Sequence, residues 1–167
     1  MTQPRAGFLL TRHWRDTPQG TELSFWLATD DGPLQVTLPP QESVAFIPEA
    51  QRAQAERLLQ GEKGFRFAPL ALKDFHRQPV VGLYCRAHRQ LMRLEKMLRD
   101  SGVTLYEGDI RPPERYLMER FITAPVWVEG ETRGPQLVNA RMKPNPDYRP
   151  PLKWVSLDIE TSRHGEL

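Results

Sequence analysis

The sequence predicts an α+β fold in which many short strands are combined with a few helices. Short apolar runs, some alternating with polar residues at period two, fill much of the first half of the chain, as half-buried strands require. Later segments place apolar residues at helical spacing, which gives a helix one face to pack on a core. The 16 prolines among 167 residues should keep the elements short, because proline interrupts helices and strands.

Turn signals separate the strands expected in the first half. Asp30-Asp31-Gly32 is typical of a hairpin turn between two strands, and Pro39-Pro40 ends the second of them. The expected strands cover residues 8–11, 23–29, 34–38 and 44–47, and residues 65–67 are expected to be extended.

The clearest helical pattern covers residues 87–100, where Leu91, Leu94 and Leu98 share one face. Strands predicted on both sides of this helix would complete a strand–helix–strand unit. These strands are expected over residues 80–85 and 103–106, and two further helices are expected over residues 49–60 and 114–122.

The end of the chain predicts a domain boundary. An antiparallel pair is expected over residues 126–128 and 137–141. The proline-rich segment 143–151 then fits neither a helix nor a central strand, so we interpret it as a linker. A single apolar strand is expected over residues 152–159. The expected domains are therefore residues 1–148 and the start of a second domain at residues 149–167.

Composition excludes several classes of protein. The chain has 23 Lys and Arg against 21 Asp and Glu, so its net charge of +2 does not by itself indicate a nucleic-acid partner. No apolar stretch approaches the ~18 residues of a membrane span, and no signal peptide is recognisable, so a cytoplasmic location is expected. The one cysteine, Cys85, excludes an internal disulfide and is expected to be a small buried strand residue.

The final predicted strand carries the one pattern that suggests catalysis. Asp158 and Glu160 alternate with apolar residues, so both carboxylates would project from one face, roughly 7 Å apart. Such a pair can bind the two divalent ions of a nuclease. A D-x-E pattern is common, however, and on the pattern alone a solvent-facing pair of charges at a strand end remains the better supported alternative.

Residues 152–161, LKWVSLDIET, resemble the first exonuclease motif of family-B DNA polymerases, whose core is D-I-E-T. Asp109-Ile110 followed by the segment RYLME at residues 115–119 resembles the D-I-x-x-x-x-R-Y-L-I-D segment that precedes this motif in archaeal members. From Gly7 onward the chain is similar to the bacterial branch of the family, the DNA polymerase II type. The resemblance covers essentially the whole chain.

This resemblance implies the N-terminal part of a DNA-directed DNA polymerase with a 3′–5′ proofreading exonuclease, which acts in DNA repair, the SOS response and replication past damage. It implies a mixed, strand-rich N-terminal domain followed by the first strand of a ribonuclease-H-like exonuclease domain. Asp158 and Glu160 match the first two metal ligands of that exonuclease, which uses Mg²⁺ or Mn²⁺. The implied partners are primer–template DNA, deoxynucleoside triphosphates and, through a C-terminal peptide, a sliding clamp.

The same resemblance implies limits on the chain itself. The other exonuclease ligands, the polymerase palm and the clamp peptide lie in sequence that these 167 residues do not contain. We therefore expect the chain alone to be inactive, with no tightly bound metal. Archaeal relatives carry Pro-Phe after D-I, lining a pocket that senses uracil, where this chain has Arg111-Pro112. A uracil-sensing function is therefore not expected.

A basic stripe is the candidate DNA-contacting surface. Arg86, Arg89, Arg93 and Lys96 fall opposite the leucines on a helical wheel and could contact phosphates. The alternative is an ordinary solvated face, partly offset by acidic neighbours. Four aromatic residues could stack on single-stranded bases, although aromatics on strands are more often core residues. They are Trp14, Phe25, Trp26 and Tyr84.

Two other functions stay open at this point. One is a stand-alone module that binds single-stranded nucleic acid without catalysis. The other is a structural or protein-interaction domain that does not bind DNA, and a DNA-binding titration at two salt concentrations would distinguish it.

Overall fold

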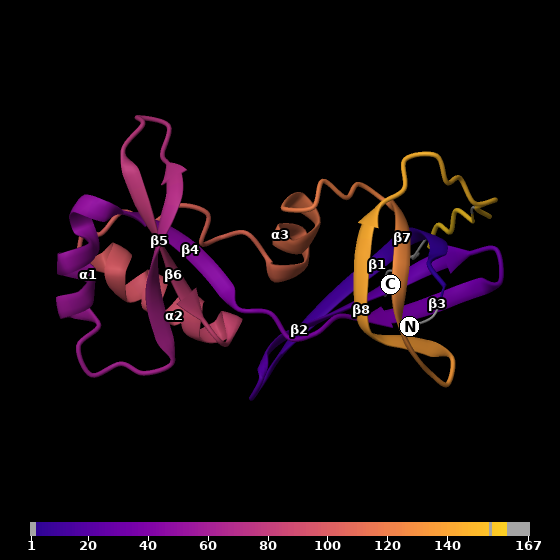
Figure 1. The fold of residues 1–167 in the computed structure, drawn as a ribbon, viewed down its shortest axis with the longest axis horizontal. Coiled ribbons are helices and arrows are strands. Elements are labelled where there is room, and N and C mark those ends of the chain that lie inside the picture. Colours follow the sequence, from indigo (N-terminus) through magenta and orange to yellow (C-terminus); the bar gives the residue numbers. More distant parts are fainter. Residues whose placement is uncertain (1–2, 154, 160–167) are drawn as a thin grey trace, which may run out of the picture.

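The computed structural model describes residues 3–153 and 155–159, which form two lobes with a short helix between them (Figure 1). One lobe is a closed five-stranded barrel, and the other is a three-stranded sheet covered by helices. This arrangement confirms the predicted strand-rich α+β class. None of the helices among the described residues is long and apolar enough to cross a membrane.

The barrel has the strand order β1-β2-β3-β8-β7, in which β3 and β8 are parallel and the other neighbours are antiparallel. Helix α3 (Pro112–Met118) lies between the third and fourth barrel strands in the sequence. A five-stranded Greek-key barrel of this connectivity is an OB fold. Its strands are β1 (Arg5–Thr17), β2 (Gly20–Thr29), β3 (Gly32–Thr37), β7 (Pro125–Arg133) and β8 (Gln136–Pro144).

Alternating side chains fill the barrel. Leu23, Phe25 and Leu27 of β2 point inward, and Tyr116 of α3 closes one end of the same core. Gly7 allows β1 to approach closely, because a Cβ there would lie 2.9 Å from Leu27 Cδ1. The barrel therefore has its own hydrophobic core, which the period-two pattern of its strands predicts.

The second lobe is inserted between β3 and α3. Its antiparallel strands are in the order β4-β6-β5, and the helices pack on one face of this sheet. As predicted, Leu91, Leu94 and Leu98 are buried in this second core. The elements are β4 (Ser43–Pro48), a 3₁₀ turn (Glu49–Gln51), α1 (Arg52–Leu58), β5 (Phe65–Lys73), β6 (Pro79–Cys85) and α2 (His88–Asp100).

Two predicted strands are wrong. Residues 103–106 bury Val103 and Leu105 but pair with β4 only at an isolated bridge between Phe46 and Tyr106. Glu107 then takes a left-handed φ of 57°, which turns the chain away before a ladder can form. The strand–helix–strand unit therefore lacks its second strand.

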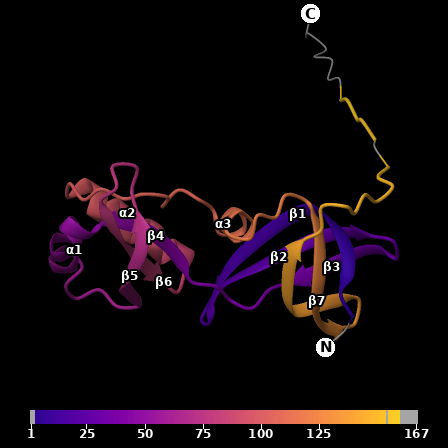
Figure 2. The same cartoon turned by 45° about the horizontal axis from the view of Figure 1, so that its top comes forward.

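The strand predicted over residues 152–159 is also absent from the residues that the structure describes. Val155, Leu157 and Ile159 have no regular secondary structure and are exposed. Figure 2 shows this segment, in yellow, leading away from both lobes, and it pairs with none of the described strands. Glu160 lies outside the described residues.

Candidate nucleic-acid interface

Hydrogen bonds from the first turn of α2 to a carboxylate on β1 join the two lobes. Asp16 Oδ1 accepts from the backbone N–H of His88 at 2.9 Å and from Thr21 Oγ1 at 2.7 Å. Asp16 Oδ2 accepts from the backbone N–H of Arg89 at 3.0 Å. Helix α2 leaves these N–H groups without an internal partner, so Asp16 caps the helix from another element. Burial raises the pKa of Asp16, but these hydrogen bonds outweigh it and the net pKa is lowered.

His88 lies at this joint, the contact between β1 and the first turn of α2. It is only 4% exposed, and its ring packs edge-on against Trp14 with a centroid distance of 4.8 Å. Its Nδ1 has no hydrogen-bond partner among the described residues. Burial lowers the pKa of His88, although Asp16 and Glu95 act in the opposite direction. A neutral His88 therefore serves as a packing residue at the joint.

Arg89, Arg93 and Lys96 of the basic stripe lie on the exposed side of α2, whereas Arg86 precedes the first residue of the helix, and the four members differ in their partners. Arg93 Nη2 lies 2.6 Å from Glu62 Oε2, and Lys96 Nζ lies 2.7 Å from Asp100 Oδ2. The side chains of Arg86 and Arg89 form no ion pair with a described residue and are exposed. The alternative of a solvated, ion-paired face thus fits Arg93 and Lys96, whereas Arg86 and Arg89 are available for a partner.

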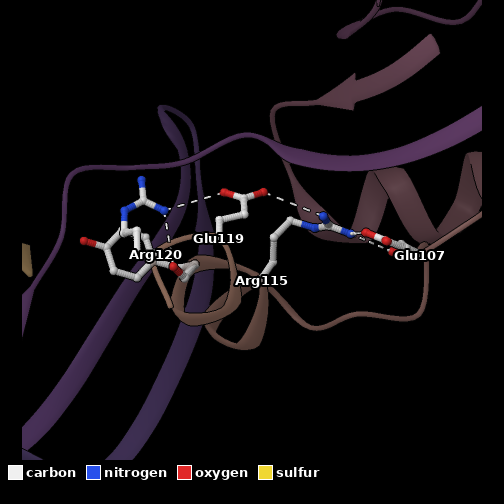
Figure 3. A network of polar contacts seen from close by, with 5 residues as sticks. Glu107, Arg115, Glu119 and Arg120 are labelled. Carbon is white, nitrogen blue, oxygen red and sulfur yellow. Dashed lines mark hydrogen bonds and ion pairs between the residues drawn. The ribbon is translucent and has the colours of Figure 1, made fainter. Parts of the chain in front are cut away.

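A cavity of about 280 Å³ separates α3 from the second lobe. On its α3 side, Arg115 Nη2 donates to the Glu107 carbonyl at 3.0 Å and lies 3.1 Å from Glu107 Oε2 (Figure 3). Glu119 lies between Arg115 Nη1 at 3.7 Å and Arg120 Nη1 at 3.5 Å. The Arg120 guanidinium also lies over the Tyr116 ring, 3.9 Å from its centroid. Two cations and two carboxylates balance, so this network orients α3 and offers little charge to an anion.

Sequence reasoning assigned no role to Asp16, Arg115 or Tyr116. A signal was present for Arg115 and Tyr116, because both lie in RYLME, a segment that carries the family resemblance. The cavity also contains Ser43, whose buried Oγ has no hydrogen-bond partner among the described residues.

The structure separates the four candidate stacking residues. The prediction that Phe25 could stack on bases is wrong, because Phe25 faces the barrel core. Trp14 packs on His88, and Tyr84 is half-buried with the Arg66 guanidinium 4.1 Å from its centroid. Trp26 is 45% exposed on the outside of the barrel. Of these four, Trp26 is therefore the one that a base could reach with its ring face.

The carboxylate pair of the motif is only partly described. Asp158 is exposed and makes no hydrogen bond or ion pair with a described residue. The described part of the chain contains no group of three or more His, Cys, Asp or Glu side chains that could hold a metal. Cys85 is buried, as predicted, and burial raises its pKa to about 12, so it is a structural residue.

Comparisons with known proteins match both lobes. The model "DNA polymerase II, N-terminal" matches residues 7–42, and "DNA polymerase II, insertion domain" matches residues 43–103. Their common boundary falls where the chain passes from the barrel to the second lobe. Together the two matches cover more than half of the chain.

A curated relative, DNA polymerase II of Escherichia coli (strain K12), is 77% identical over 163 residues, which are 98% of this chain and 21% of the relative. The fold is similar to that of the family B DNA polymerase from the archaeon Pyrobaculum calidifontis, with a TM-score of 0.64 and 16% identity over 80% of this chain and 19% of that chain. The chain thus spans about a fifth of the length of these proteins. It belongs to the DNA polymerase II family of family-B DNA polymerases, and it carries that family's N-terminal and insertion domains.

Proposed function

We propose that this chain is the N-terminal part of a DNA-directed DNA polymerase that edits 3′ ends and acts in DNA repair and replication past damage. The identity of 77% to DNA polymerase II over 98% of the chain carries this proposal. Because the chain spans 21% of that relative, nucleotide addition and clamp binding are assigned to sequence outside it. The substrates are primer–template DNA and deoxynucleoside triphosphates, and the location is the cytoplasm.

The chain's catalytic share is a pair of metal ligands in the exonuclease. Asp158 and Glu160 match the D-I-E-T motif and would hold Mg²⁺ or Mn²⁺ together with carboxylates from elsewhere in the polymerase. Oxygen ligands of this kind suit both ions. Such a metal pair stabilises the attacking and leaving oxygens of phosphate hydrolysis. The domain that contains the pair is proposed to begin at residue 149, after a first domain of residues 1–148.

The test uses the complete polymerase that contains this chain. Asp158→Ala is expected to abolish degradation of a 3′-labelled single strand while primer extension continues. The matched control is Asp109→Ala, which removes an exposed carboxylate outside the motif. A polymerase without extension activity, or an Asp158→Ala variant that still degrades the strand, would contradict the proposal. The 167-residue chain alone should do neither reaction, since two carboxylates cannot enclose a metal pair.

The basic stripe is proposed as a phosphate-contacting surface, with Arg86 and Arg89 as its main contacts. Each phosphate that a cation neutralises adds about 0.7 to the slope of log K against log salt on single strands. Arg86→Ala and Arg89→Ala should each lower the slope by about this amount. Arg93 and Lys96 should contribute less, because each would first have to leave an ion pair.

A second candidate function is a nucleic-acid-binding module that works without catalysis. The OB topology of the barrel favours it, since many OB folds bind oligonucleotides. The sequence that follows Leu167 in the gene distinguishes the two candidates. A downstream Asn-…-Phe-Asp motif and Tyr-…-Asp motif would support the polymerase.

A further inference from the structure

We infer that the outer face of the barrel around Trp26 is a binding site for single-stranded nucleic acid, separate from the carboxylate pair and from the basic stripe. The inference rests on the proposed function in one respect, namely that the partner is nucleic acid. It adds a location and the side chains that would make the contact.

Strand register places five outward-facing side chains in one row across the whole barrel wall. Directly paired residues project from the same face of a sheet. Trp26 pairs with Thr11 on one side and with Gln35 on the other, Gln35 pairs with Gln136, and Gln136 pairs with Arg133. The residues that alternate with this row, including Phe25, Leu27, Leu34, Val36 and Leu137, are buried inside the barrel. The row therefore faces solvent.

This row lies where OB folds bind oligonucleotides. The usual surface is the face of the second and third strands, flanked by the loop between the fourth and fifth. In this barrel those strands are β2 and β3, which carry Trp26 and Gln35. The flanking loop is the β7–β8 turn, beside which Arg133 and Gln136 lie. Topology and register thus agree on one surface.

The chemistry of the row fits single-stranded bases better than a protein partner. Trp26 is isolated among polar neighbours, whereas the fully buried core of a protein interface is more apolar than the rest of the surface. A base presents a ring face for Trp26 and polar edges for the amides of Gln35 and Gln136. None of the five side chains in the row makes a hydrogen bond or ion pair with a described residue, so no existing bond must break.

The charges near the row favour a polyanion. The outward residues of β2 and β3 on either side, Ser24, Ala28, Pro33 and Thr37, carry no charge. Arg133 provides a cation at one end of the row. Three carboxylates of these strands and turns are engaged, since Glu22 pairs with Arg15 at 2.7 Å, Asp30 accepts from Tyr148 and Glu131 accepts from Asn139. Asp31 in the β2–β3 turn is exposed and makes no side-chain hydrogen bond or ion pair with a described residue.

The test is a fluorescence-anisotropy titration of the 167-residue chain with labelled oligo-dT of about 12 nucleotides, within the ~4–16 nucleotides that one OB fold occupies. Trp26→Ala should weaken binding roughly 5- to 150-fold, the range expected for loss of one stacked base. Trp26→Phe should restore most of the affinity, because it keeps a ring. Arg133→Gln should lower the salt slope by about 0.7.

The matched control is Trp127→Ala. Trp127 is 38% exposed on β7, which does not neighbour β2 in the barrel, so its loss should leave binding unchanged. Circular dichroism and thermal melting establish that each variant is folded. Absence of binding by the parent chain, unchanged affinity in Trp26→Ala, or an equal loss in Trp127→Ala would overturn the inference. None of these outcomes affects primer extension by the complete polymerase, so the proposed function fails or stands separately.

Discussion

Replacing Asp16 by Ala should loosen the joint between the two lobes. The change removes the side-chain cap of α2, which costs about 0.5 to 2 kcal/mol. It also removes the acceptor for the hydroxyl of Thr21, a fully buried residue, and a buried donor without a partner costs about 1 to 3 kcal/mol. Because Thr21 Oγ1 can itself accept from the His88 N–H at 3.2 Å, the cap loss is partly offset. We expect a total loss of roughly 2 to 4 kcal/mol.

Urea unfolding at pH 7, followed by circular dichroism, measures this loss, and amide hydrogen exchange locates it. The amides of His88 and Arg89 should lose protection first. The carboxylate pKa lies below its ordinary value of 3.8 in the fold, so its contribution is present above that pH and is lost as the pH falls further. The difference between variant and parent should therefore shrink at pH 3. A variant within 0.5 kcal/mol of the parent at pH 7, roughly the scatter of neutral substitutions, would refute this account of the joint.

Three further changes test other features of the fold. His88→Phe should reduce the loss of stability that the parent undergoes as the pH falls below 6.5. Burial lowers the pKa of His88, so protonation of histidine in acid favours the unfolded chain. Unfolding at several pH values measures this difference. Cys85, with its pKa raised to about 12, should react with a thiol reagent at pH 8 only as fast as the chain unfolds. Phe121 is 87% exposed and holds a left-handed φ of 53° after α3, a conformation that glycine adopts without strain. Phe121→Gly should therefore stabilise the chain by about 0.5 to 1 kcal/mol in thermal unfolding. Phe121→Ala keeps the strain and should not stabilise.

Local patterns in the sequence predicted most elements but not their lengths. The apolar run at residues 8–11 marks only the middle of β1, which continues to Thr17. The charged half of that strand was not predicted, because its side chains have partners far away in the sequence. Arg12 pairs with Glu114 at 2.7 Å, and Asp16 caps α2. Such contacts stabilise a strand without leaving any alternation in its own sequence.

The barrel topology could not be predicted from local patterns at all. The parallel pairing of β3 with β8 joins residues about 100 positions apart, at Gln35 with Gln136 and Val36 with Leu137. The second lobe lies between these strands in the sequence and has its own core. Composition shows no shift where this lobe begins, so the chain was expected to form one domain through residue 148. The exposed position of Trp26 follows from the same long-range pairing, which is why its role emerged only with the structure.

The position of Asp16 explains how an inserted lobe can be attached firmly to a small barrel. The chain leaves the barrel after β3 and returns to it at α3. These two connections alone would allow the second lobe to rotate relative to the barrel. Two further links oppose that rotation: the paired backbones of Thr21 and Gln41, at 2.9 and 2.8 Å, and the Asp16 cap on α2. Both links converge on the same end of the β1–β2 hairpin. Turning the second lobe relative to the barrel would require these hydrogen bonds to break. The orientation of α2, and with it the position of Arg89, therefore depends on the Thr21–Gln41 bridge together with one carboxylate of the barrel.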